Sequence, residues 1–158
     1  MMMLLVLMGL LIIIGYLCVV CVKWGRQTSI SQSYYVLPVG RGWVFRLVML
    51  SQVVCLLPRM LEVSGECWEW LAFVTMVGIG MVGAAPELHD AWQEKVHNVG
   101  GWLSVLGCFF WLLFFCPLVL SGCLLILLVP LLDKGHWKWW VEVVCIGMIY
   151  VSLLISIF

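Results

Sequence analysis

The side chains best suited to chemistry gather in one polar stretch, PELHDAWQEKVHNVGG, at residues 86–101. This stretch holds two of the chain's three histidines and three of its eight acidic residues. Glu94 and His97 have the Glu-x-x-His spacing of carboxylate-bridged metal bundles, and Asp90 lies one helical turn before Glu94. Because the chain has no second Glu-x-x-His, we expect no metal, although Asp90, Glu94 and His97 are the ligands that a mononuclear site would use. The histidines that would complete such a site are His89 and His136.

A second interpretation of the same stretch needs no ligand. Pro86 suits the first position of a helix and Gly100-Gly101 suits its end, so the stretch predicts a short helix or an extension of the apolar helix that follows. At helical spacing its apolar and polar side chains separate into two stripes. We favour this interpretation, in which the apolar stripe lies in the headgroup boundary and the acids are solvated. A proton relay stays open, since histidine titrates near neutral pH.

The composition of the chain indicates a lipid bilayer as its surroundings. Hydrophobic residues make up 65% of the 158 residues and charged residues 10%, values outside the range of ordinary soluble domains. The formal net charge is zero, which argues against the clustered basic surface of a nucleic-acid-binding protein. Seven of the eight cysteines fall in apolar runs, where they are expected to act as small packing residues.

The apolar runs predict an all-α, polytopic bundle of transmembrane helices that forms a single domain over residues 1–158. A helix needs about 17–25 residues to cross a hydrocarbon core of ~30 Å. The run Trp102–Leu132 would be about 46 Å long as one helix, and Pro117 can open a second helix within it. The run is therefore one bent helix or two spans. The version with six spans, which we favour over five, places them at residues 3–22, 43–61, 68–85, 99–115, 118–132 and 140–158.

The basic residues distinguish five spans from six. With five spans and an outside N-terminus, four lysines and arginines in the connections fall inside and three fall outside. With six spans only Arg59 is outside, and this asymmetry is the positive-inside pattern. The residues then placed inside are Lys23, Arg26, Arg41, Lys95, Lys134 and Lys138. We therefore predict a multi-pass protein of the cell membrane with six spans and both termini outside.

Six spans would place three polar connections, residues 23–42, 86–101 and 133–139, on the cytoplasmic face. Serines, acids and histidines from all three connections would meet there. This face is therefore the predicted binding surface for a ligand or a partner. The residues predicted to form it are Ser29, Ser31, Tyr34, Glu87, His89, Asp90, Glu94, His97 and His136.

Two ionisable residues, Arg46 and Glu142, fall inside predicted spans. A charge in hydrocarbon costs several kcal/mol unless it is paired or hydrated, so both residues are functional candidates. Arg46 has a stem long enough to reach the headgroups, whereas Glu142, with its shorter stem, is expected to have a protein partner. Pairing of the two side chains across helices is the alternative.

Several short motifs resemble those of known membrane proteins. They are SISQSYYVLP after the first span, FVTMVGIGMVGAAP at the end of the third and KVHNVGG at the start of the fourth. Together they resemble a group of uncharacterised small multi-span integral membrane proteins from bacteria and their phages, and the resemblance implies a topology. The motifs are distantly similar to larger families that include intramembrane zinc hydrolases, which use several histidines with Asp and Ser. A late His-x-x-x-His is absent here, which leaves Ser31, Asp90 and His97 without the metal ligands of that chemistry.

The functional expectation is a non-enzymatic membrane protein, a small carrier, accessory or interaction protein. Its cytoplasmic face would bind a protein partner, a lipid headgroup or a small solute, and a homo-oligomer is possible on the same grounds. We expect no cofactor and no nucleic acid. The alternative is a metal-dependent membrane enzyme that acts on a lipid or isoprenoid near the inner leaflet, with Asp90, Glu94 and His97 as ligands.

Overall fold

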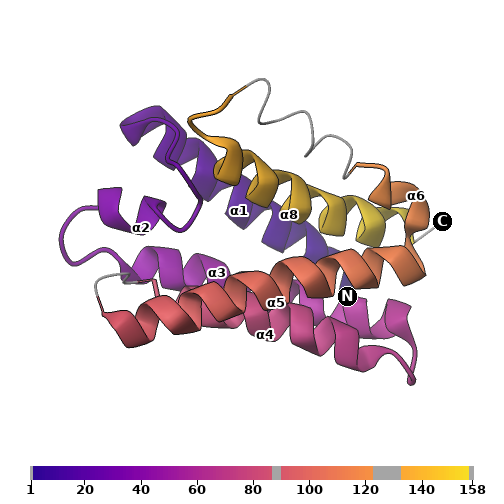
Figure 1. The fold of residues 1–158 in the computed structure, drawn as a ribbon. Helices are drawn as coiled ribbons and strands as arrows, with labels where there is room; N and C mark the ends of the chain where they lie inside the picture. The colour runs from indigo at the N-terminus through magenta and orange to yellow at the C-terminus, as the bar shows by residue number, and fades with distance from the viewer. Residues whose placement is uncertain (1, 87–89, 123–132, 157–158) are drawn as a thin grey trace.

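The computed structural model describes residues 2–86, 90–122 and 133–156. Within these ranges every regular element is a helix, which confirms the all-α prediction. The helices are α1 (Met2–Trp24), α2 (Ser33–Val36), α3 (Trp43–Ser64), α4 (Glu69–Ala84), α5 (Ala91–Phe115), α6 (Pro117–Leu120) and α8 (Trp137–Ile155) (Figure 1).

Four of these helices, α1, α3, α5 and α8, are long and apolar enough to cross a membrane. Helix α4 is also apolar but has 16 residues, about 24 Å against a hydrocarbon core of ~30 Å. The predicted helical membrane bundle is therefore found, but the count of six spans is wrong for the described residues. Of the predicted span 118–132, the structure describes the short α6 and its end, and residues 123–132 lie outside the described ranges.

The long apolar run breaks at Cys116. Helix α5 ends at Phe115, Cys116 takes a non-helical conformation with φ −142° and ψ 59°, and Pro117 begins α6. Proline restricts the residue before it and lacks an N–H, so it is well tolerated only at the first turn of a new helix. This confirms the predicted break at Pro117 and rules out one continuous helix over Trp102–Leu132.

Helix α5 begins later than predicted and continues straight into the membrane-spanning segment. Its first residue is Ala91, and the Asp90 carboxylate caps it by accepting a hydrogen bond from the Trp92 N–H at 3.0 Å. The predicted start at Pro86 is therefore wrong, because the aspartate provides the stronger N-cap. Of the two forms predicted for this stretch, the extension of the following helix is the one found.

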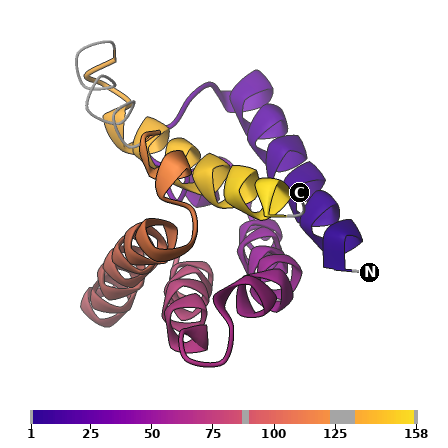
Figure 2. The same cartoon turned by 90° about the vertical axis from the view of Figure 1, so that its right-hand side faces the viewer.

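The segments that carry most of the basic residues lie at the left-hand end of the bundle in Figure 1, and Figure 2 views the bundle from the other end. We call the left-hand end the basic end and define it as residues 23–46, 85–97 and 133–138, within the described ranges. Helices α5 and α8 run in the same direction, and both chain termini lie at the opposite end. Contacts along α8 agree: the Cys116 thiol lies 3.9 Å from the Ser152 carbonyl, whereas Asp133 pairs with Arg26. The two flanks of residues 123–132 therefore lie at opposite ends of the bundle.

Seven of the eight lysines and arginines lie at the basic end, with Arg59 at the other. The three connections predicted to share one face do so in the described residues. Tyr35 OH donates to the Pro86 carbonyl at 3.2 Å, and the Trp139 N–H donates to the Thr28 carbonyl at 3.1 Å.

Helix α4 packs most extensively against α5, and α3 against α4. Glycines make this possible: a Cβ at Gly78 would lie 2.4 Å from the Ser104 backbone nitrogen, and one at Gly100 would lie 2.6 Å from Met81 Cβ. The small residues of α4 thus allow a close contact with α5. Helix α8 touches α5 much less.

Tryptophans mark several helix ends, where a membrane protein usually places them. Trp24 ends α1, Trp43 begins α3 and Trp137 begins α8, and all three are exposed. Trp111 is different, because it is fully buried and its indole N–H donates to Ser64 Oγ of α3 at 2.7 Å. A buried tryptophan usually has such a hydrogen-bond partner.

Candidate functional site

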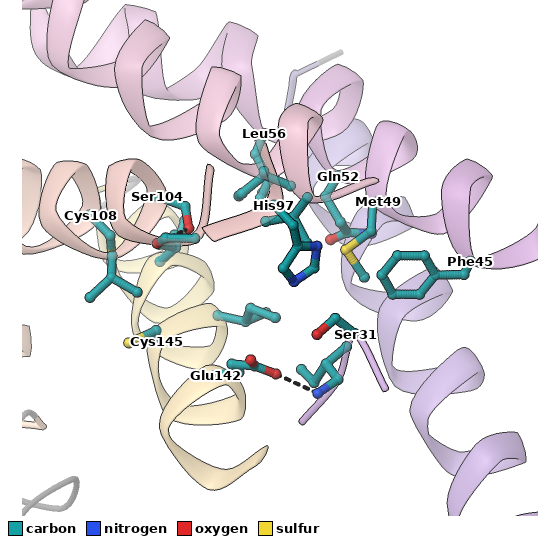
Figure 3. Close-up of a pocket in the computed structure, with 17 residues that line it drawn as sticks. Ser31, Phe45, Met49, Gln52, Leu56, His97, Ser104, Cys108, Glu142 and Cys145 are labelled. Carbon is teal, nitrogen blue, oxygen red and sulfur yellow. Dashed lines mark hydrogen bonds between the residues drawn. The ribbon is translucent and has the colours of Figure 1, made fainter. Parts of the chain in front are cut away.

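A cavity of about 150 Å³ lies between α3, α4, α5 and α8, beside the loop before α2 (Figure 3). Most of its lining side chains are apolar, among them Phe45, Met49 and Leu56 of α3. The polar residues among those that line it are Ser31, Gln52, His97, Ser104 and Glu142. A mainly apolar hollow with a few convergent polar groups is the usual form of a small-molecule site.

Three of the polar residues meet at the end of the cavity nearest the basic end. Ser31 comes from the loop, His97 from the second turn of α5 and Glu142 from the second turn of α8. Figure 3 shows the three side chains facing a common space. All three were predicted from sequence, although Glu142 was predicted as a separate intramembrane group.

Glu142 has a hydrogen-bond partner within the protein, as expected for a side chain too short to reach the headgroups. Its Oε2 accepts a hydrogen bond from the Ile30 backbone N–H. One turn earlier on α8 the free N–H of Trp139 donates to the Thr28 carbonyl, so the start of α8 binds the loop twice. These bonds hold both the loop and the carboxylate against the cavity.

The loop that carries Ser31 is held by its own serines. Ser29 Oγ lies 3.0 Å from Ser31 Oγ, and both residues are buried. Ser33 is fully buried and donates to the Ile30 carbonyl, while its oxygen lies 2.6 Å from Tyr16 OH of α1. The loop is therefore a hydrogen-bonded wall of the cavity, fixed to both α1 and α8.

His97 is oriented by the end of α4. Its Nδ1 lies 3.0 Å from the Ala85 carbonyl oxygen. Because a carbonyl can only accept, Nδ1 carries the proton, and Nε2 of the neutral ring is an acceptor. Gly100 lies one turn further along α5, so the close contact of α4 with α5 fixes how near His97 comes to Ala85.

Gln52 contributes to the cavity but is engaged by the surrounding helices. Its Nε2 donates to the Gly9 carbonyl of α1 at 3.3 Å, and its Oε1 accepts from Tyr150 OH of α8 at 2.5 Å. The residue is buried, with 3% of its surface exposed. Sequence reasoning missed Gln52, although an amide inside an apolar span was a usable signal for a polar partner.

Ser104 and the cysteines of the cavity were also missed. Ser104 Oγ donates to the Gly101 carbonyl at 2.9 Å, one turn back on α5. Cys108 and Cys145 line the cavity from α5 and α8. Serine and cysteine are common packing residues in apolar helices, so the sequence held no signal that these positions face a cavity.

The other predicted site residues have different surroundings. Tyr34 packs its ring against Phe45, with 6.1 Å between ring centroids, and the Arg46 guanidinium lies 5.9 Å from its centre. Asp90 caps α5, and Glu94 is exposed. Glu87 and His89 lie outside the described residues.

The third histidine takes part in a cluster outside the cavity. His136 Nδ1 lies 3.1 Å from Asp133 Oδ1, and Arg26 and the Trp140 indole each reach Asp133 Oδ2 at 3.2 Å. The hydrogen bond from His136 is the main cause that lowers the pKa of the Asp133 carboxyl below its ordinary value, and Trp140 and Arg26 add to it. This cluster ties the end of α1 to the start of α8.

Asp90, Glu94 and His97 are not gathered around one point in the described part of the chain. All three are described, and no group of three or more potential ligands that could hold a metal is found among the described residues. Asp90 is engaged as a cap, Glu94 points to solvent and His97 turns to Ala85 and the cavity. The structure gives the predicted trio no common centre.

Comparison with known proteins adds no identification. No protein-family model, curated protein or solved structure matches the chain. The class that fold and cavity define is a helical membrane protein with a polar-ended cavity between its helices. The resemblance to small multi-span proteins of bacteria and their phages stays a prediction.

Proposed function

We propose that the protein is a non-enzymatic, multi-pass membrane protein that binds a small, largely apolar solute between its helices, as a carrier or accessory protein does. The observation that carries this proposal is the cavity, in which Ser31, His97 and Glu142 converge at one end of an apolar hollow. Such a site fixes a ligand by a few polar contacts and holds its body by apolar contact.

The hydrogen bonds around the cavity favour binding over catalysis. A nucleophile needs an adjacent base that is itself oriented for proton transfer. Here the Ser31 hydroxyl pairs with Ser29 Oγ at 3.0 Å, and among the described residues no hydrogen bond joins Ser31 to His97, the nearest candidate base. A metal-dependent enzyme has less support, since Asp90, Glu94 and His97 are separated.

We also propose that the basic end faces the cytoplasm, with both termini outside. The support is the seven-to-one distribution of lysines and arginines between the two ends. Cys67 lies exposed at the other end. A membrane-impermeant thiol reagent should therefore label Cys67 in intact cells, and labelling only after lysis would contradict this orientation.

A cavity-filling substitution tests the binding function. Val105 lines the cavity, whereas Val54 on α3 is 66% exposed on the outer surface of the bundle. We expect hexanol to bind saturably to the protein in detergent micelles, measured by calorimetry after subtraction of its partition into empty micelles. Val105→Phe should abolish the saturable heat by filling the cavity, and the matched Val54→Phe should leave it unchanged. Equal heats in both variants would refute a site in the cavity.

A further inference from the structure

We infer that the cavity selects a primary ammonium on a short unbranched apolar chain. This inference rests on the proposed binding function and names the class of ligand. It is argued from three features: the hydrogen-bonding groups of Ser31, His97 and Glu142 at one end of the cavity, the charge of the lining residues, and the length of the cavity.

The polar groups at that end are mostly acceptors. The Glu142 carboxylate is an acceptor, and His97 Nε2 is one because Nδ1 donates to Ala85. Two turns further along α5, Ser104 donates its proton to the Gly101 carbonyl, so only the lone pairs of its oxygen remain for a ligand. The nearest backbone donor, the Ile30 N–H, is already given to Glu142. A ligand that brings several donors complements this arrangement, and an ammonium brings three.

Glu142 is held in place with one oxygen still available. Among the described residues its hydrogen bond is the one from Ile30 to Oε2, and Oε1 has none. The Ile30 N–H thus fixes the position of the carboxylate, while Oε1 can still accept a hydrogen bond from a ligand. A carboxylate in apolar surroundings is unfavourable unless paired, so a cation that reaches Oε1 gains a charge-assisted hydrogen bond.

The charged side chain that lines the cavity is acidic, which suits a cationic ligand. Of the lining residues that the structure describes, Glu142 is the acid and none is lysine or arginine. Lys138 lies one turn before Glu142 on α8, but its ammonium lies over the Trp137 ring, 5.7 Å from the centre. When Glu142 is ionised, a cationic ligand is therefore attracted and an anionic one repelled.

The length of the cavity defines the body of the ligand. Its lining on α3 runs from Phe45 to Leu56 and on α5 from His97 to Cys108, each about 16 Å along a helix axis. A volume of about 150 Å³ spread over that length is narrow. It fits a linear chain that points from the polar end toward Leu56, Cys108 and Ile149.

Three probes of equal chain length test this inference: hexylamine, hexanol and hexanoate. They are titrated at neutral pH into the full-length protein in detergent micelles, with partition into empty micelles subtracted. An alkylammonium is fully charged at this pH, as a lysine side chain is. We expect hexylamine to bind at least tenfold more tightly than hexanol, and hexanoate to bind most weakly.

Glu142→Gln isolates the charge, because a glutamine oxygen can still accept from Ile30. We expect this variant to bind hexylamine no more tightly than hexanol, with hexanol affinity unchanged as evidence that the cavity is intact. Glu66→Gln, the same substitution at an exposed site near the opposite end, should behave as the wild type. If the wild type binds hexanol as tightly as hexylamine, the ammonium inference fails and the binding function stands. If none of the probes binds saturably, the proposed function itself fails.

Discussion

The two sides of helix α5 are built differently, and two adjacent glycines show the contrast. A Cβ at Gly100 would lie 2.6 Å from Met81 Cβ and 2.8 Å from the Gly78 carbonyl of α4. A Cβ at Gly101 would meet nothing within 4 Å, and Gly101 lines the cavity. Small residues therefore bring backbones together on one side and leave space on the other. The closest backbone packing of α5 is against α4, whereas its other side faces the cavity that α3 and α8 also line.

The largest expected effect compares these two glycines directly. Gly100→Ala places a methyl group against backbone atoms that cannot move aside, and we expect it to lower the free energy of unfolding by about 1–3 kcal/mol. Gly101→Ala should change it by no more than about 0.5–1 kcal/mol, with a gain favoured by helix propensity. Equilibrium unfolding in mixed micelles measures both. Equal losses would show that the side of α5 toward α8 is as tightly packed as the other.

A smaller effect is expected where α8 is tied to the rest of the bundle. Tyr150→Phe removes the hydrogen bond to Gln52 Oε1 and leaves that buried oxygen without its donor. Interhelical hydrogen bonds of this kind contribute about 1 kcal/mol in membrane proteins. The same unfolding measurement should show a loss of this size, with the contact of α4 with α5 preserved. A loss larger than that of Gly100→Ala would reverse the ranking of the two sides.

The smallest effect is expected at the Asp133 cluster, where Arg26 is 49% exposed and solvent screens the pair. The pKa of Asp133 is lowered in the folded chain, so its contribution to stability is present above the ordinary pKa of the carboxyl. It is lost as the pH falls through the lowered value. Asp133→Asn should therefore reduce the melting temperature slightly at neutral pH, and the difference from the wild type should shrink in acid. A difference that grew in acid would contradict the assignment.

The features that local chemistry determines could be predicted from the sequence. Pro117 breaks the apolar run because its ring and missing N–H act within one turn. The composition predicted the apolar helices, because apolar content is a property of each segment by itself. In the described residues four helices are long enough to span a membrane, fewer than the six predicted, because hydropathy measures apolar length and not helix length: α4 has 16 residues, and α6 has four.

The candidate site was predicted only in part, because a cavity depends on how distant helices pack. Glu142 and His97 stood out as ionisable groups in or near apolar sequence, and both line the cavity. Asp90 has the same chemical type, yet its position before α5 makes it a cap. Nothing in the sequence around Ser104 distinguishes the side of α5 that meets α4 from the side that meets α8. That distinction arises only when Gly78 and Gly100 bring two backbones together.

The uneven distribution of lysines and arginines also restricts how copies of the chain can associate. With seven at one end and one at the other, insertion in both orientations is strongly disfavoured. With the orientation proposed above, an inverted, head-to-tail pair of copies within one bilayer is disfavoured. Self-association along the exposed apolar faces of α1 and α3 would then join copies that point the same way, with their cavities on the same side of the membrane.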